Sequence, residues 1–163
     1  PGLHLRAAGS LRPGRRMSVA VVPVAAEHRA RWEALYAGYA AFYKVEQTEA
    51  MRATVWGWLM DPAHEVKGLV ALLDGKVVGL IHYRPFARPL RAIYGTFADD
   101  LFVDPACRGQ RVADALLLAV KAEAKKAGHN VVRWITADDN YRGRGVYDRV
   151  GTRTMWITYD MPL

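Results

Sequence analysis

The segment DDLFVDPACRGQRVADALLLAV, residues 99–120, decides how the rest of the chain is organised. A hydrophobic run at residues 101–103 predicts a buried strand, and a polar loop over residues 108–111 separates it from an amphipathic helix. A strand that enters a helix through a glycine-containing loop directs free backbone N–H groups and the positive end of the helix toward one point. This arrangement predicts a phosphate-binding site at the start of the helix.

Length and composition indicate one intracellular domain. The chain has 163 residues, of which 52% are apolar, and this is enough for a single hydrophobic core. No apolar run approaches the roughly 20 residues of a membrane span. The single cysteine, Cys107, excludes an internal disulfide, and the five histidines are scattered, so no metal cluster is predicted. We therefore expect a cytoplasmic protein with no bound metal and no membrane partner.

The positive charge of the chain is concentrated at its start. The net charge is +7, but residues 1–16 carry four arginines and no acidic residue. Without these arginines the 23 basic residues fall to 19 against 16 acidic ones, a balance of +3. We interpret residues 1–16 as a disordered or cloning-derived leader and residues 17–163 as a single domain. The charge therefore gives little support to nucleic-acid binding, and no specific nucleic acid is expected as a partner.

Hydrophobic periodicity predicts an alternation of strands and helices along the domain. The predicted strands are 19–24, 66–73, 76–83, 94–103, 131–136 and 152–161, and the predicted helices are 26–44, 47–60, 110–127 and 140–150. Residues 84–91, with two prolines and three arginines, are predicted to form a loop. This order indicates an α/β (α+β) fold, in which a mixed, mostly antiparallel sheet of six to seven strands has helices on both faces.

The loop before the long helix carries the first family motif. Its sequence is Arg108-Gly109-Gln110-Arg111-Val112-Ala113, which resembles the Q/R-x-x-G-x-G/A signature of the GNAT superfamily of N-acetyltransferases. The resemblance implies the GNAT fold, with strands splayed around an acyl-CoA site, and acetyl-CoA bound through its pyrophosphate at this loop. Arg111 replaces the central glycine of the signature, where its side chain would either crowd the pyrophosphate or add a cation to it.

A second motif follows the predicted strand 131–136. The sequence from Asn140 to Tyr147, NYRGRGVY, resembles the N-x-x-A-x-x-L-Y of the same superfamily, with Gly143 and Val146 in place of Ala and Leu. Asn140 and Tyr147 are two helical turns apart and share a face. The resemblance implies that Tyr147 acts as the general acid that protonates the leaving thiolate. The alternative is that Tyr147 is an ordinary core tyrosine.

The strand before the loop carries a third motif. Asp99-Asp100-Leu101-Phe102-Val103 resembles the E-D-hydrophobic-hydrophobic-V run of polyamine acetyltransferases and yeast histone/polyamine acetyltransferases. Asp99 stands where these relatives have a glutamate that acts as a general base through water. In a regular strand Asp99 and Asp100 face opposite sides, unless a bulge intervenes. The alternative is that both carboxylates are solvated or paired with nearby arginines.

The sequence thus predicts a set of site residues and leaves the acceptor open. The predicted catalytic residues are Tyr147 and Asp99, and the predicted cofactor-binding residues are Leu101, Phe102, Val103, Arg108, Gly109, Gln110, Arg111, Val112, Ala113, Asn140 and Tyr147. An aromatic slot for an amine, or simply the core, is predicted for Trp32, Tyr36, Tyr39, Tyr43, Trp56 and Tyr83. Cys107 is expected to pack beside the loop rather than to carry an acyl group.

Two functional hypotheses remain open at this point. The first is an acetyl-CoA-dependent N-acetyltransferase that transfers the acetyl group directly to a primary amine, of a small molecule or a protein, in a ternary complex. The second is a non-catalytic acyl-CoA-binding or regulatory module on the same fold. The resemblance also implies a homodimer, because close relatives pair through their C-terminal strands.

Overall fold

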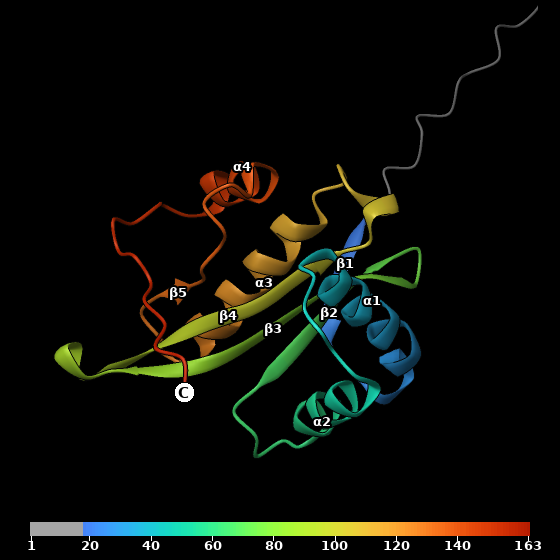
Figure 1. The fold of residues 1–163 in the computed structure, drawn as a ribbon, viewed down its shortest axis with the longest axis horizontal. Helices are drawn as coiled ribbons and strands as arrows, with labels where there is room; N and C mark the ends of the chain where they lie inside the picture. The colour runs from blue at the N-terminus through green and yellow to red at the C-terminus, as the bar shows by residue number, and fades with distance from the viewer. Residues whose placement is uncertain (1–17) are drawn as a thin grey trace, which may run out of the picture.

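The computed structural model describes residues 18–163, so the predicted leader at residues 1–16 lies outside the described part of the chain. Its centre is one sheet whose strands follow their order in the sequence, β1-β2-β3-β4-β5 (Figure 1). The strands are β1 (Val19–Pro23), β2 (Lys67–Leu73), β3 (Lys76–Arg88), β4 (Ile93–Val103) and β5 (Val132–Arg133). The first three ladders are antiparallel, and β4 and β5 run parallel.

Helices cover both faces of this sheet, as predicted. They are α1 (Arg29–Phe42), α2 (Glu49–Met60), α3 (Val112–Lys126) and α4 (Tyr141–Val150), with 3-10 turns η1 (Ala26–His28), η2 (Pro89–Arg91) and η3 (Pro105–Cys107). Figure 1 shows α1 and α2 on one side of the sheet and α3 on the other. None of the helices in residues 18–163 is both long enough and apolar enough to cross a membrane.

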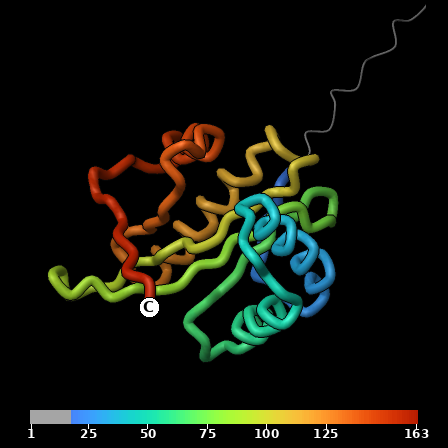
Figure 2. Tube along the Cα trace, in the orientation of Figure 1, coloured from blue at the N-terminus to red at the C-terminus, as the bar shows by residue number. Residues whose placement is uncertain are grey.

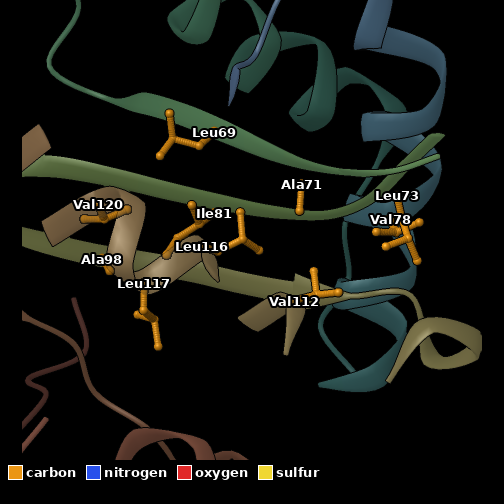
Figure 3. Close-up of a cluster of buried hydrophobic side chains, with 10 residues drawn as sticks. All are labelled: Leu69, Ala71, Leu73, Val78, Ile81, Ala98, Val112, Leu116, Leu117 and Val120. Carbon is orange, nitrogen blue, oxygen red and sulfur yellow. The ribbon is translucent and has the colours of Figure 1, made fainter. Parts of the chain in front are cut away.

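The strand β3 joins two hydrophobic clusters because it is buried on both faces. Leu80 and Ile81 are adjacent in sequence and both are 0% exposed, yet successive side chains of a strand point to opposite faces. Leu80 packs in the cluster that contains Trp32 of α1, and Ile81 packs in the cluster that contains Leu116 of α3. Figure 3 shows the second cluster, in which side chains of α3 meet those of β2, β3 and β4.

The prediction of a loop at residues 84–91 is wrong for most of this range. β3 continues through this region, and the turn Pro89–Arg91 connects it to β4. The pairing persists because Arg84 lies opposite Phe97, with its guanidinium carbon 5.2 Å from the centroid of the phenyl ring. Pro85 is tolerated because the ladder with β2 has ended before it, so its missing N–H costs no hydrogen bond on that edge.

The predicted final strand at residues 152–161 is also wrong, and the predicted strand at 131–136 shrinks to the two residues of β5. A strand needs a partner for its backbone groups, and residues 152–163 pair with none of the strands in the described part of the chain. They leave α4 as an extended segment, drawn in red in Figure 2. The sheet therefore has five strands in residues 18–163 instead of six to seven.

An irregularity in β4 sets the directions of its two aspartates. The ladder between β3 and β4 pairs His82 with Asp100 and Tyr83 with Ala98, so Asp99 has no partner across the ladder. This is a β-bulge, one extra residue on one strand. It shifts the alternation of side chains beyond it, so Asp100 shares the α1 side of the sheet with His82.

β4 and β5 separate at the same place. Their ladder consists of two pairs, Thr96 with Val132 and Phe97 with Arg133. Beyond Phe97, residues 98–103 of β4 have no ladder with β5. This divergence agrees with the splayed strands that the family resemblance implies, and it opens the sheet directly before the loop that leads into α3.

The packing of α3 gives a prediction about stability. Leu116 is 0% exposed in the core cluster beneath α3, so Leu116→Ala leaves a cavity and should lower the free energy of unfolding by about 2–5 kcal/mol. Urea denaturation measures this loss. Leu118→Ala on the same helix is the control, because Leu118 is 52% exposed and its truncation should change the stability by less than about 0.5 kcal/mol. Equal effects of the two substitutions would contradict the packing.

Candidate active site

A cavity of about 480 Å³ lies where β4 leaves β5. Its wall comes from the end of α1, the second half of β4, the loop before α3, the first turn of α3 and one side of α4. The structure brings these predicted cofactor-binding residues to it: Leu101, Phe102, Val103, Arg108, Gly109, Arg111, Val112, Ala113, Asn140 and Tyr147. Gln110 does not line this cavity.

The loop before α3 exposes backbone N–H groups toward the cavity. Gly109 has φ = 80° and Arg111 has φ = 61°, and Arg111 is the N-cap of α3 without a side-chain hydrogen bond to the helix. The first N–H groups of a helix have no partner within it, and Val112 and Ala113 both lie on the cavity wall. This helix end is therefore suited to an anion.

Arg111 pays a conformational cost at the position where the family has glycine. A left-handed backbone costs a non-glycine residue about 1–2 kcal/mol. The Arg111 side chain is 71% exposed, with Nη1 3.7 Å from Asp114 Oδ1. The guanidinium therefore lies near the first turn of α3, largely in solvent, and it adds a cation to the wall of the cavity.

Asp114 in the first turn of α3 is neutralised by Arg149 of α4. The guanidinium donates from Nε and Nη2 to the two carboxylate oxygens over 3.2 and 3.0 Å. This hydrogen bonding raises the pKa of Arg149. Because the acidic charge is compensated, the end of α3 keeps its attraction for an anion.

Several residues of the wall were not among the predicted cofactor-binding residues. Tyr43 was predicted for the aromatic slot, Gly143 and Val146 were named only as motif positions, and Cys107 was expected only as a packing residue. Phe42, Asp114, Arg142 and Arg149 were not predicted at all. The two arginines of α4 could have been found, because they are seven residues apart and share a face of the helix. Phe42 had no such signal, since it reaches the cavity only because the end of α1 lies beside the second half of β4.

Asn140 acts as the cap of α4. Its Oδ1 accepts from the N–H of Gly143 over 3.1 Å, and its Nδ2 donates to Thr136 Oγ1 over 3.0 Å. A Cβ on Gly143 would lie 2.4 Å from Asn140 Nδ2, which is too close for the capped geometry.

Asp99 and Tyr147 meet at a second, smaller cavity. This cavity, of about 30 Å³, is lined by Asp99 of β4, Tyr147 of α4 and Tyr39 of α1, and it shares Tyr43, Leu101 and Tyr147 with the large one. Burial raises the pKa of Tyr147, and Tyr43 adds to the rise. The Tyr147 phenol is therefore protonated at neutral pH and can donate a proton.

The Asp99 carboxylate is held by an arginine of the neighbouring strand. Arg84 Nε donates to the two oxygens of Asp99 over 3.3 and 3.1 Å. Burial raises the pKa of Asp99, and Arg84 opposes this rise. Asp99 thus lines the small cavity and is paired with an arginine, as one of the two alternatives for it predicted. Its role as a general base stays a prediction.

The aromatic residues of the N-terminal half divide between core and cavity. Trp32, Tyr36 and Trp56 are at most 9% exposed and belong to the core cluster on the α1 side. Tyr39 and Tyr43 line the small cavity, and Tyr83 packs against the cluster beneath α3. Of the predicted slot, two tyrosines are therefore placed to contact a ligand. No group of three or more metal-ligating side chains is assembled anywhere in residues 18–163.

Comparison with known proteins decides the family. The model of the acetyltransferase (GNAT) family matches residues 32–152, which is most of the chain. The chain belongs to this family. Membership confirms the superfamily that the loop and α4 motifs resemble, and with it the reaction class, acetyl transfer. The narrower likeness to polyamine and histone acetyltransferases stays a prediction.

Solved structures share the GNAT fold of this chain. A probable acetyltransferase is 26% identical, with 88% of this chain and 97% of that chain covered and a TM-score of 0.79. The aminoglycoside N-acetyltransferase AAC(6')-Iy in complex with CoA is 15% identical over 93% and 99% of the two chains, with a TM-score of 0.79. A ribosomal-protein-alanine N-acetyltransferase from Brucella melitensis biovar Abortus 2308 is 18% identical over 90% and 100%, with a TM-score of 0.72.

The ion pair of Asp99 predicts a shift that can be measured in this GNAT protein. Arg84→Met removes the cation that holds the pKa of Asp99 down against burial, so the pKa should rise further. A ¹³C NMR titration of the Asp99 carboxyl carbon measures the change. Asp104 is the control, because its pKa is lowered mainly by the N–H of Ala106 and should not respond. An unchanged titration of Asp99 would contradict the ion pair.

Proposed function

We propose that this protein is an acetyl-CoA-dependent N-acetyltransferase that transfers the acetyl group directly to a primary amine in a ternary complex. The observation that carries the proposal is the meeting of Asp99 and Tyr147 at one cavity, where β4 diverges from β5. The acceptor amine belongs either to a small molecule or to a protein.

The large cavity suits the phosphate groups of acetyl-CoA. The N–H groups at the start of α3 face it, and cations line it on two sides, Arg108 and Arg111 from the loop and Arg142 from α4. Phosphate binding at a helix N-terminus beside arginines is electrostatically favourable. Acetyl-CoA would supply the activated acyl group, with its thioester directed toward β4 and the small cavity.

Asp99 and Tyr147 have complementary tasks in the proposed reaction. An alkylammonium must lose a proton before it attacks, because its ordinary pKa is about 10.4. Asp99 accepts this proton through water, and the neutral amine then attacks the thioester carbonyl to form the C–N bond of a tetrahedral intermediate. The nitrogen loses its second proton to solvent, and the C–S bond breaks as the intermediate collapses. Tyr147 gives its proton to the leaving thiolate and regains one from solvent. A backbone N–H of residues 101–103, beside the gap to β5, stabilises the oxyanion.

Two substitutions separate catalysis from cofactor binding. Tyr147→Phe removes the proton donor and should lower kcat by about 10²–10⁴-fold with little change in the KM for acetyl-CoA. Arg108→Ala should instead raise that KM, because it removes a cation from the phosphate site. Thiol release from acetyl-CoA with a panel of primary amines measures both constants.

Glu65→Gln is the matched control, since Glu65 is an exposed carboxylate between α2 and β2 and its loss should change neither constant. Unchanged kcat in Tyr147→Phe would reduce Tyr147 to a packing residue, and an unchanged KM in Arg108→Ala would refute the phosphate site. Binding of acetyl-CoA without turnover on any amine would favour a non-catalytic acyl-CoA-binding module.

We also propose that the protein is a cytoplasmic homodimer. The thiol of Cys107 is free, which suits a reducing compartment. The support for a dimer is the segment after α4, which has the composition of a strand but lies exposed. Its apolar side chains are 74–94% exposed at Met155, Trp156, Ile157, Tyr159 and Met161. Exposed apolar surface of this extent marks an interface, and a second copy of the chain is its proposed partner.

The dimer predicts a measurable mass. The 18.2 kDa chain should elute as a species of twice its mass in size-exclusion chromatography with light scattering. Substitution of Trp156 and Ile157 together by serine should yield the monomer, because it removes apolar area from the interface. Leu118→Ser, on the exposed side of α3, should remain dimeric. A wild-type protein of monomer mass would refute the proposal.

A further inference from the structure

A buried chain of hydrogen bonds beside the active site is used by no step of the proposed reaction. It joins Trp32 of α1, His82 of β3 and Asp100 of β4. Trp32 Nε1 lies 2.9 Å from His82 Nε2, and His82 Nδ1 lies 2.8 Å from Asp100 Oδ2. Trp32 and His82 are 1% and 2% exposed, so this polar network lies within the core.

The chemistry of the network fixes the protonation of its histidine. An indole N–H can only donate, so Nε2 of His82 accepts and the ring carries its proton on Nδ1. His82 is then neutral and donates to Asp100. A second proton on the ring, at Nε2, would point an N–H of His82 at the N–H of Trp32, and neither group could accept the other's hydrogen bond. His82 therefore orients the Asp100 carboxylate without cancelling its charge.

The partners of Asp100 and Asp99 differ in charge. Asp99 is paired with the Arg84 guanidinium, whereas the hydrogen bonds to Asp100 come from neutral groups. Tyr36 donates to the same oxygen, Oδ2, over 3.1 Å. The Asp100 side chain is 23% exposed, whereas that of His82 is 2% exposed, so Asp100 is the end of the network that borders solvent.

Aromatic residues near Asp100 also border the small cavity, where the proposed reaction takes place. Its negative charge contributes to raising the pKa values of Tyr36 and Tyr39, after burial. Tyr39 packs edge-on against Phe102, with ring centroids 5.8 Å apart, and it lines the small cavity together with Asp99. A cation at Asp100 would thus have aromatic rings beside it, which favour cations, on the side toward the small cavity.

We propose that Asp100 binds the protonated amino group of the acceptor, and that Trp32 and His82 are positioning residues that hold its carboxylate. The acceptor class is then a primary alkylamine, bound as its alkylammonium form. This inference rests on the proposed N-acetyltransferase activity and adds the residue that selects the substrate. It requires a charged acceptor, because a neutral amine gains little from an oriented carboxylate.

The test is a comparison of the KM values for two substrates. Asp100→Asn should raise the KM for a primary alkylamine, such as benzylamine, lysine amide or spermidine, whichever the wild-type protein acetylates best, at least tenfold. The KM for acetyl-CoA should stay within about twofold, since Asp100 is not one of the residues that line the large cavity. A purely structural role would move both KM values together.

Variants of the positioning residues give a second measurement that does not depend on Asp100→Asn folding. Trp32→Phe keeps a ring but loses the donor, and His82→Phe loses the donor to Asp100, so both should raise the KM for the amine. His82→Asn should lie closer to the wild type than His82→Phe, because a side-chain amide can replace the Nδ1–H donor. Glu65→Gln again serves as the control, with unchanged KM values.

The outcomes separate the two proposals. If the wild-type protein acetylates none of the amines, the proposed function fails and this inference fails with it. If the wild type is active and Asp100→Asn keeps its KM for the alkylamine, the inference alone is overturned. Equal KM values for His82→Phe and the wild type would overturn the positioning role.

Discussion

The structure depends on the separation of β4 from β5. After two paired residues in each strand the ladder ends, and the second half of β4 borders a cavity instead of a neighbouring strand. The bulge at Asp99 lies at this same point. The sheet therefore opens beside two adjacent carboxylates that have different partners, Arg84 for Asp99 and His82 for Asp100.

Three aspartates near the cavities differ in their hydrogen-bonding partners, and these partners determine the chemical role that each carboxylate suits. Asp114 is bound by both nitrogens of the Arg149 fork, which leaves the end of α3 favourable for phosphate. Asp99 shares its charge with Arg84 while burial raises its pKa, a setting that suits proton exchange better than firm cation binding. Asp100 is oriented by hydrogen bonds from the neutral side chains of Tyr36 and His82. The same type of side chain thus suits three proposed roles, in cofactor binding, proton transfer and substrate selection, because its neighbours differ.

Two local features near the cavities are energetically unfavourable, a strained backbone and a buried polar network. Arg111 occupies a left-handed conformation that glycine would adopt without strain, and the core on the α1 side accommodates a tryptophan–histidine–aspartate network in place of apolar packing. Buried polar groups are tolerated only when their hydrogen bonds are made. The large apolar clusters on both sides of β3 supply the stability that allows these local departures.

The sequence by itself determined the order of elements through residue 150, the loop that begins α3, and the placement of Asn140 and Tyr147 along α4 so that both line one cavity. These features follow from local spacing, since a helix face or a strand–loop–helix turn involves residues that are close in the chain. The length of β3 and the absence of a strand after α4 were decided by tertiary pairing, because a strand exists only where another strand accepts its hydrogen bonds. The convergence of Asp99 with Tyr147, and of Trp32 with His82 and Asp100, was likewise decided by tertiary structure. Each set joins elements that are distant in sequence, and only the bulge and the divergence of β4 turn their side chains toward a common point.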